Sequence, residues 1–251
     1  MRFKTKVAIV TGASSGIGRT TAMMFATEGA KVAVVARRED QGKETVSMIK
    51  EAGGEATFFQ ADMNSADAIK NLVERVVETY GQLDYAFNNA GTAEPAVGIL
   101  DLTEDEWDRV MNTNLKAVWL CMKYQIPEIL KNGGGAIVNN SSIWGVLGTS
   151  MGVPAYVASK HGVIGLSKAA ALEYGTKNIR VNAICPAWVP TPGNEPVLSN
   201  PELNSQITAQ HPIGRLGTQE DIANAVMWLC SDESSWYTAQ ALVVDGGYSA
   251  Q

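Results

Sequence analysis

The sequence predicts a doubly wound α/β fold, in which one parallel sheet of seven strands is covered by helices on both faces. Short apolar runs alternate with longer helix-forming segments along the chain. The runs lack the polar alternation of a half-exposed strand, so both faces of each strand are expected to be covered. No linker interrupts the alternation, and 251 residues suit one large α/β domain.

The expected elements follow one another in strand–helix order. Glycines and a helical segment follow the first apolar run, and helix-forming segments follow the second and third runs. A long helical segment precedes the fifth run, a strongly helical one precedes the sixth, and a late helix precedes the last. The expected strands are residues 7–10, 32–35, 56–59, 83–87, 136–139, 179–184 and 241–244. The expected helices are residues 17–28, 40–52, 66–80, 104–130, 156–174 and 221–229.

One long connection departs from this rhythm. Residues 187–212 are rich in Pro, Asn, Gly and Ser, and connections of this length are often functional lids. We expect residues 1–251 to form a single domain with a substrate lid at about 187–212. A passive surface insertion is the alternative for this segment.

Composition and charge argue against several classes of protein. The formal net charge of −6 argues against a nucleic-acid partner, because phosphate backbones require a basic face. The three cysteines lie in apolar runs without CxxC spacing and are expected to be reduced core thiols. With only two histidines, no metal site is expected. No signal-peptide pattern and no run of membrane-spanning length occurs, so we expect a cytoplasmic location without membrane contact.

A glycine-rich turn joins the first expected strand to the first expected helix. Residues 11–18 read Thr-Gly-Ala-Ser-Ser-Gly-Ile-Gly. Glycines permit a tight turn and close approach to a pyrophosphate, and the helix N-terminus offers free N–H groups to the phosphates. Glycine also serves packing in many such turns, but this position between strand and helix favours dinucleotide binding. The turn residues expected to bind the cofactor are Gly12, Ser14, Ser15, Gly16, Ile17 and Gly18.

The end of the second expected strand indicates which dinucleotide is bound. An acidic residue there would bind the ribose 2′-hydroxyl of NAD. This strand instead ends in Arg37 and Arg38, whose guanidinium groups can form charge-assisted hydrogen bonds with a 2′-phosphate. The sequence therefore predicts a preference for NADP(H) over NAD(H). The alternative is that one or both arginines only begin a solvated helix.

Taken together, the motifs resemble those of the short-chain dehydrogenase/reductase family over nearly the whole chain. Any one motif is modest evidence, but all of them in order at the family's spacing are specific. The motifs are Thr11-Gly12-xxx-Gly16-x-Gly18, Asn88-Asn89-Ala90-Gly91, Asn114, Ser141-Ser142, Tyr156-xxx-Lys160 and Asp245-Gly246-Gly247.

The resemblance implies a Rossmann-like fold, a nicotinamide cofactor, a role for each matching residue, and a homotetramer. The implied catalytic residues are Asn114, Ser142, Tyr156 and Lys160. Besides the turn and the arginines, the implied cofactor-binding residues are Asp62, Met63, Asn88, Ala90, Gly91, Tyr156, Lys160, Pro186, Val189 and Thr191. The chain departs from the family where the usual Pro-Gly is Pro186-Ala187, followed by the bulky Trp188, so the site is expected to have a different roof there.

The implied catalytic residues suit hydride transfer between a carbonyl and an alcohol. Negative charge develops on the carbonyl oxygen during reduction, so an acid must supply a proton there. A free Tyr has a pKa near 10, and a lysine four residues away on the same helix face is expected to lower the pKa of Tyr156. Ser142 would hydrogen-bond the substrate oxygen, and Asn114 would hold a water that links Lys160 to solvent. Ser141 is expected to be structural.

Residues near these groups indicate an apolar ketone or secondary alcohol as the small-molecule substrate. The expected substrate contacts are Ile143, Trp144, Thr149, Val153, Trp188 and residues 194–207. Both tryptophans could equally belong to the core.

Other functions stay open at this point. One alternative is a catalytically weak cofactor-binding regulatory protein, although Tyr156 and Lys160 are both retained. Another is a reductase specific for 3-oxoacyl groups on a carrier. An epimerase or dehydratase of the longer branch would need a larger C-terminal domain than the chain has room for after Pro186.

Overall fold

Seven parallel strands form one sheet at the centre of the molecule. The computed structural model describes residues 1–251, and the strand order across the sheet is β3-β2-β1-β4-β5-β6-β7. Every neighbouring pair is parallel. The strands are β1 (Val7–Thr11), β2 (Lys31–Ala36), β3 (Glu55–Gln60), β4 (Tyr85–Asn88), β5 (Gly135–Asn140), β6 (Ile179–Pro186) and β7 (Ala241–Val244). The predicted fold class is confirmed.

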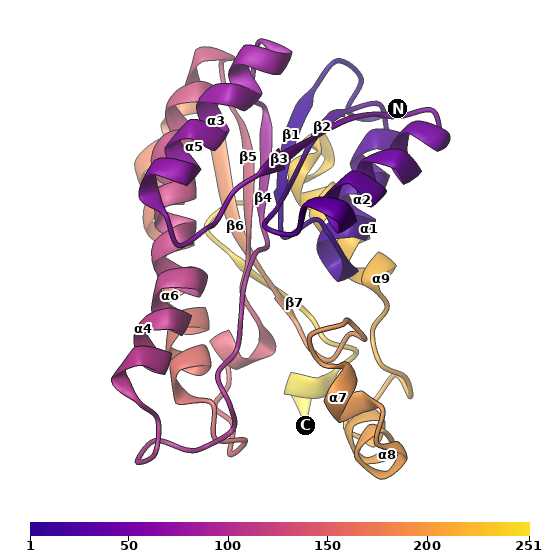
Figure 1. Cartoon of the computed structure of the whole chain (residues 1–251), viewed down its shortest axis with the longest axis vertical. Coiled ribbons are helices and arrows are strands. Elements are labelled where there is room, and N and C mark those ends of the chain that lie inside the picture. The colour runs from indigo at the N-terminus through magenta and orange to yellow at the C-terminus, as the bar shows by residue number, and fades with distance from the viewer.

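Helices cover both faces of this sheet. In Figure 1, α3, α5 and α6 lie on one side of the strands, and α1, α2 and α9 lie on the other. Two buried apolar clusters, one on each side, join these helices to the sheet. The α-helices are α1 (Gly16–Thr27), α2 (Glu39–Glu51), α3 (Ala66–Tyr80), α4 (Glu104–Met111), α5 (Ala117–Lys131), α6 (Pro154–Tyr174), α7 (Glu195–Leu198), α8 (Pro201–Ala209) and α9 (Gln219–Cys230).

The strand order reverses between β1 and β4. The chain builds outward from β1 to β2 and β3, crosses back to place β4 beside β1, and then builds outward on the other side. The connections that leave β1 and β4 therefore diverge, which opens a crevice at the carboxyl ends of these strands. The glycine turn follows β1, so the fold places it at this crevice.

The long helical segment expected at 104–130 contains an irregular turn. Between α4 and α5, the chain forms a π-helical turn over Asn112–Lys116, and Asn114 lies inside it. Such turns occur mostly as single insertions in α-helices, often at functional sites. The sequence predicted the helix but not this local change of hydrogen-bond register. Within the irregular turn, Asn114 faces α6 and donates to Ser159.

The segment at 187–212 is more ordered than a loop. It contains the short helix α7 and the helix α8, which begins at Pro201 with Asn200 as its N-cap. The Asn200 side chain accepts hydrogen bonds from the N–H groups of Glu202 and Leu203. Figure 1 shows α7 and α8 below the carboxyl ends of the strands, close to the C-terminus.

A buried cluster of side-chain amides ties the sheet to the helices on one face. The Asn88 amide donates to Asn139 Oδ1 at 2.9 Å and to Gln125 Oε1 at 3.1 Å, and Gln125 donates back to Asn88. Asn139 in turn donates to Ser167 Oγ. All four side chains are buried, and each would be costly to bury without a partner. The cluster therefore specifies how β4 and β5 sit against α5 and α6.

Candidate active site

A cavity of about 820 Å³ opens at the carboxyl ends of the strands, where the strand order reverses. This volume lies within the range of small-molecule and cofactor sites. Its walls come from the connections after β1 to β6, from α6 and from the start of the 187–212 segment. The glycine turn, Tyr156 and Trp188 all line this one cavity.

The glycine turn is fixed to the neighbouring strand by Thr11. Its hydroxyl accepts hydrogen bonds from the backbone N–H groups of Asn89 and Ala90 at 2.9 and 3.0 Å. Gly12 adopts φ +66°, and a Cβ there would lie 2.9 Å from Asn89 Nδ2. A Cβ on Gly18 would clash with the Gly12 carbonyl oxygen, so α1 approaches the turn as closely as only glycine permits.

The N-terminus of α1 suits an anionic group. Its N-cap, Ser15, is extended and makes no side-chain hydrogen bond to the first turn, and no acidic residue occupies that turn. The first N–H groups of the helix thus have no side-chain cap, and the helix dipole favours negative charge at this point. Ser14, Ser15 and Ile17 line the cavity, whereas Gly16 and Gly18 shape the turn behind them.

The two arginines after β2 differ in how they are held. The Arg38 guanidinium donates to the hydroxyls of Ser14 and Ser15, each at 3.2 Å, so it lies against the glycine turn. Arg37 also lines the cavity, and its carbonyl accepts a hydrogen bond from Gln60. Both side chains belong to exposed residues. Arg38 is therefore the more firmly held of the two arginines.

Tyr156 is the third residue of α6, and its side chain points into the cavity. The N-terminal turn of α6 begins at Pro154, which suits the first position of a helix because it lacks the N–H that has no partner there. Burial raises the pKa of the Tyr156 phenol, a hydrogen bond with Ser142 lowers it, and the nearby Glu94 raises it. The net direction of the Tyr156 pKa is upward, whereas the sequence led us to expect a lowered pKa beside Lys160.

Lys160 lies one helical turn after Tyr156. Its Nζ lies 5.4 Å from the centroid of the Tyr156 ring and donates to the carbonyl oxygen of Asn140 at 2.8 Å. The residue is only 3% exposed. Because burial penalises the charged form, the pKa of Lys160 falls to about 8.

Ser142 and Ser141 have different surroundings. Ser142 is the N-cap of the 3₁₀ turn η2 (Ile143–Gly145), and its hydroxyl accepts from Trp144 N and lies at the cavity beside Tyr156. The Ser141 hydroxyl donates to the Lys160 carbonyl oxygen at 2.8 Å and so ties β5 to α6. This geometry agrees with a structural part for Ser141.

Asn114 lies behind the cavity wall. Its Oδ1 accepts from Thr92 N at 2.8 Å, and its Nδ2 donates to the Thr92 carbonyl oxygen and to Ser159 Oγ. The side chain therefore braces the connection after β4 against α6. Its expected part in a proton relay stays a prediction.

Most of the other expected cofactor contacts line the cavity. Asn88 does not, because its amide is turned into the buried cluster with Asn139 and Gln125; the neighbouring Asn89 lines the cavity instead. The pairing of two buried amides on adjacent strands decides this, and the motif alone does not reveal it. The lining residues among the expected contacts are Asp62, Met63, Ala90, Gly91, Pro186, Val189 and Thr191.

Two tryptophans line the part of the cavity around Tyr156, which we call the deep end. The ring of Trp144 meets Tyr156 edge-on at 6.2 Å and Trp188 edge-on at 5.5 Å between centroids. Ile143 and Val153, also expected, line the same end. Thr149 does not line the cavity, and within 194–207 only Asn194 and Val197 do.

Sequence reasoning missed several lining residues, among them Glu94 and Met151. Both lie in irregular connections that carry no periodic signal, so nothing in the sequence pointed to them.

Elsewhere the chain shows no metal-binding cluster and no membrane-spanning helix. No three His, Cys, Asp or Glu side chains gather closely enough to hold a metal ion. No helix combines the length and the apolar character needed to cross a bilayer.

The chain resembles known proteins over nearly its whole length. A family model described as enoyl-(acyl carrier protein) reductase matches residues 12–249. Cyclohexanol dehydrogenase from Acinetobacter sp. (strain SE19) is 42% identical over 250 residues, which cover 100% of this chain and 97% of the relative. A 3-oxoacyl-[acyl-carrier-protein] reductase from Thermotoga maritima is 40% identical over 252 residues, covering 98% and 99%.

Solved structures show the same fold. Levodione reductase superposes with a TM-score of 0.95 at 32% identity, covering 99% of both chains. A protein from Beutenbergia cavernae, assigned as an NAD(P)-dependent gluconate 5-dehydrogenase, superposes with a TM-score of 0.94 at 34% identity over 100% of both chains. That structure holds NADP at low occupancy.

The buried lysine generates a prediction about stability and pH. The pKa of Lys160 is about 8 in the folded protein and has an ordinary value of 10.5, so the unfolded chain binds more protons between these pH values. Stability attributable to this group therefore rises with pH through that window. We expect the stability gain of Lys160→Met over wild type to be about 2 to 3 kcal/mol larger at pH 7 than at pH 10.

Urea unfolding of the cofactor-free proteins at both pH values measures this difference. Lys168→Met, at an exposed position of the same helix, is the matched control and should show no comparable change. An equal effect of Lys160→Met at pH 7 and pH 10 would contradict the prediction.

Proposed function

The chain belongs to the short-chain dehydrogenase/reductase family of oxidoreductases, and on this premise we propose that it interconverts a ketone or aldehyde with the corresponding alcohol, using NADP(H). One observation carries the proposal. Tyr156, Ser142 and Lys160 gather in the same cavity as the glycine turn. A dinucleotide whose pyrophosphate lies on the turn would bring its reactive ring to the phenol.

The residues present fit a phosphorylated dinucleotide. The uncapped N-terminus of α1 and the glycine turn would hold the pyrophosphate, and Arg38 with Arg37 would hold the 2′-phosphate. Asp62 and Met63 would meet the adenine, and Val189 and Thr191 the nicotinamide carboxamide. The cofactor, when bound, supplies or accepts the hydride.

The side chains at the deep end would handle the proton and the developing charge. Tyr156 gives its proton to the carbonyl oxygen in reduction and removes the hydroxyl proton in oxidation. Ser142 donates a hydrogen bond to the same oxygen and positions it. Lys160, as a cation beside the ring, favours the phenolate when oxidation requires it. Asn114 would hold the water through which Lys160 exchanges protons with solvent.

Within this reaction class, we propose a cyclic, mainly apolar ketone or secondary alcohol as substrate. The orthogonal rings of Trp144 and Trp188, with Ile143 and Val153, offer flat apolar walls. The similarity to a cyclohexanol dehydrogenase supports the same class. The 187–212 segment would close over the substrate through Asn194 and Val197. An NADPH assay against cyclic ketones and 3-oxoacyl thioesters tests this choice, and faster turnover of the thioesters would overturn it.

We also propose a homotetramer, as the family resemblance implies. The outer faces of α5 and α6 bear an apolar groove between Leu115, Trp119 and Leu166, and Trp119 and Leu172 are exposed. Large apolar patches on a surface mark interaction sites. Light scattering should give four times the 26.8 kDa of one chain, and a monomer would refute the proposal. A cytoplasmic location stays a prediction from the sequence.

Removal of the phenol hydroxyl tests the proposed acid and base. Tyr156→Phe keeps the ring against Trp144 and Lys160 but leaves no group to transfer the proton. We expect kcat to fall by at least about 100-fold while NADPH still binds, as followed by nucleotide fluorescence. Near-normal turnover by Tyr156→Phe would contradict the assignment of Tyr156 as the acid and base. Tyr124→Phe, on α5 and away from the cavity, is the matched control.

The arginine pair generates a prediction about cofactor choice. Arg38→Ala removes a guanidinium held beside the glycine turn, so kcat/KM for NADPH should fall by about 10- to 100-fold while that for NADH changes little. Lys43→Ala removes an exposed cation from α2, outside the cavity, and should leave both values unchanged. Equal use of NADPH and NADH by the wild type would contradict the preference itself.

A further inference from the structure

One buried carboxyl group has no part in the mechanism above. Glu94 lies in the connection between β4 and α4, lines the deep end of the cavity, and is only 6% exposed. No lysine, arginine or histidine forms an ion pair with it. A buried carboxyl without a cation requires hydrogen-bond donors, and the nature of these donors indicates its part.

The donor to Glu94 is the backbone of the residue that bears the proposed catalytic phenol. Tyr156 N–H donates to both carboxyl oxygens of Glu94, at 3.0 and 3.1 Å. Tyr156 is the third residue of α6, and its N–H is one of those that the helix itself cannot satisfy. The N-cap residue, Val153, has no side-chain acceptor. Glu94, 62 residues earlier in the chain, therefore supplies the cap that the local sequence lacks.

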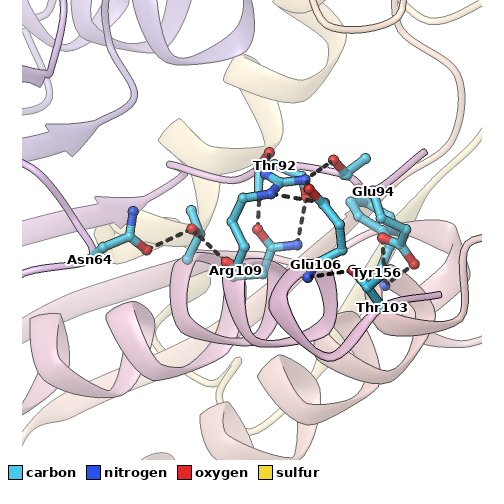
Figure 2. A network of polar contacts seen from close by, with 10 residues as sticks. Asn64, Thr92, Glu94, Thr103, Glu106, Arg109 and Tyr156 are labelled. Atoms are coloured by element: carbon cyan, nitrogen blue, oxygen red, sulfur yellow. Dashed lines mark hydrogen bonds and ion pairs between the residues drawn. The ribbon is translucent and has the colours of Figure 1, made fainter.

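The connection that carries Glu94 is itself held firmly. The Arg109 guanidinium on α4 donates to Thr92 Oγ1 at 2.7 Å and to the Ala93 carbonyl oxygen at 2.8 Å. Asn114 binds both backbone groups of Thr92 from the π-helical turn. Figure 2 shows Arg109 reaching Thr92 on one side while Glu94 lies against Tyr156 on the other. Movement of α6 relative to this connection would break the Glu94 contact.

We propose that Glu94 is a positioning residue, whose buried carboxyl caps the N-terminus of α6 from the β4–α4 connection and so holds the Tyr156 phenol at the reacting end of the cavity. The inference rests on the proposed function, because it concerns the same hydride-transfer reaction. The position of α6 matters for the proposed reaction, because displacement of a reacting group by about 1 Å can reduce a rate by about 100-fold.

The same contact places a negative group beside the phenol. Glu94 raises the pKa of Tyr156, in the same direction as burial and against the Ser142 hydrogen bond. The other ionisable groups that face this point are Lys160, 5.4 Å from the ring centroid, and Cys185 near Lys160, whose thiol has a pKa raised by burial to about 11. Arg109 faces the opposite side of the connection and pairs with Glu106. Removal of the Glu94 charge should therefore lower the pKa of Tyr156.

Two substitutions separate the cap from the charge. Glu94→Gln keeps an acceptor for the Tyr156 N–H but removes the charge, whereas Glu94→Ala removes both. For Glu94→Gln, the limb of the pH profile of kcat/KM that reports Tyr156 should move to lower pH, in reduction and in oxidation. For Glu94→Ala, kcat should fall by about 10- to 100-fold, with NADPH affinity within about 2-fold of wild type. Glu104→Gln, an exposed carboxyl at the start of α4, is the matched control for charge.

Unfolding temperatures show whether each variant folds. Should Glu94→Ala not fold, Glu94→Asp keeps the charge but shortens the reach to α6, and it should lower kcat without moving the limb. A pH profile of kcat/KM for Glu94→Gln that coincides with that of the wild type would overturn the inference. A wild-type kcat in folded Glu94→Ala or Glu94→Asp would also overturn it. Wild-type protein without turnover on any ketone or alcohol would instead overturn the proposed function, so the two failures are distinguishable.

Discussion

The reversal of strand order between β1 and β4 determines where everything else in the site lies. Parallel strands end at the same edge of the sheet, and at this point their connections lead to opposite faces. The glycine turn leaves β1 toward one face, and the connection after β4 leads toward the other. The cavity between them is thus a consequence of chain topology, and the side chains around it differentiate this protein from others with the same sheet.

Burial gives the polar groups near this edge their properties. Lys160 is buried with its ammonium against the carbonyl oxygen of Asn140, so the ammonium has lost much of its hydration, and its pKa falls. Tyr156 is affected in the opposite sense because its charged form is an anion. Burial thus favours the neutral form of both groups.

Hydrogen bonds from distant segments hold the N-terminal part of α6 in place. Ser141 binds the carbonyl oxygen of Lys160, Asn114 binds Ser159, and Glu94 binds the N–H of Tyr156. These partners come from the residue that follows β5, from the π-helical turn and from the connection after β4. The helix that carries Tyr156 and Lys160 is therefore fixed by three separate segments, which limits the motion available to the phenol.

The sequence by itself determined the order and type of nearly all elements, because strand burial and helix periodicity are local patterns. Its motifs also singled out the glycine turn, Ser142, Tyr156 and Lys160, through their resemblance to the short-chain dehydrogenase/reductase family. Only the tertiary structure decided which neighbours these residues meet. Asn88 turned into a buried amide cluster, Arg38 rather than Arg37 is anchored to the turn, and Glu94 caps a helix far along the chain. These contacts join segments without a regular pattern, and their geometry depends on how the elements pack, which no local spacing records.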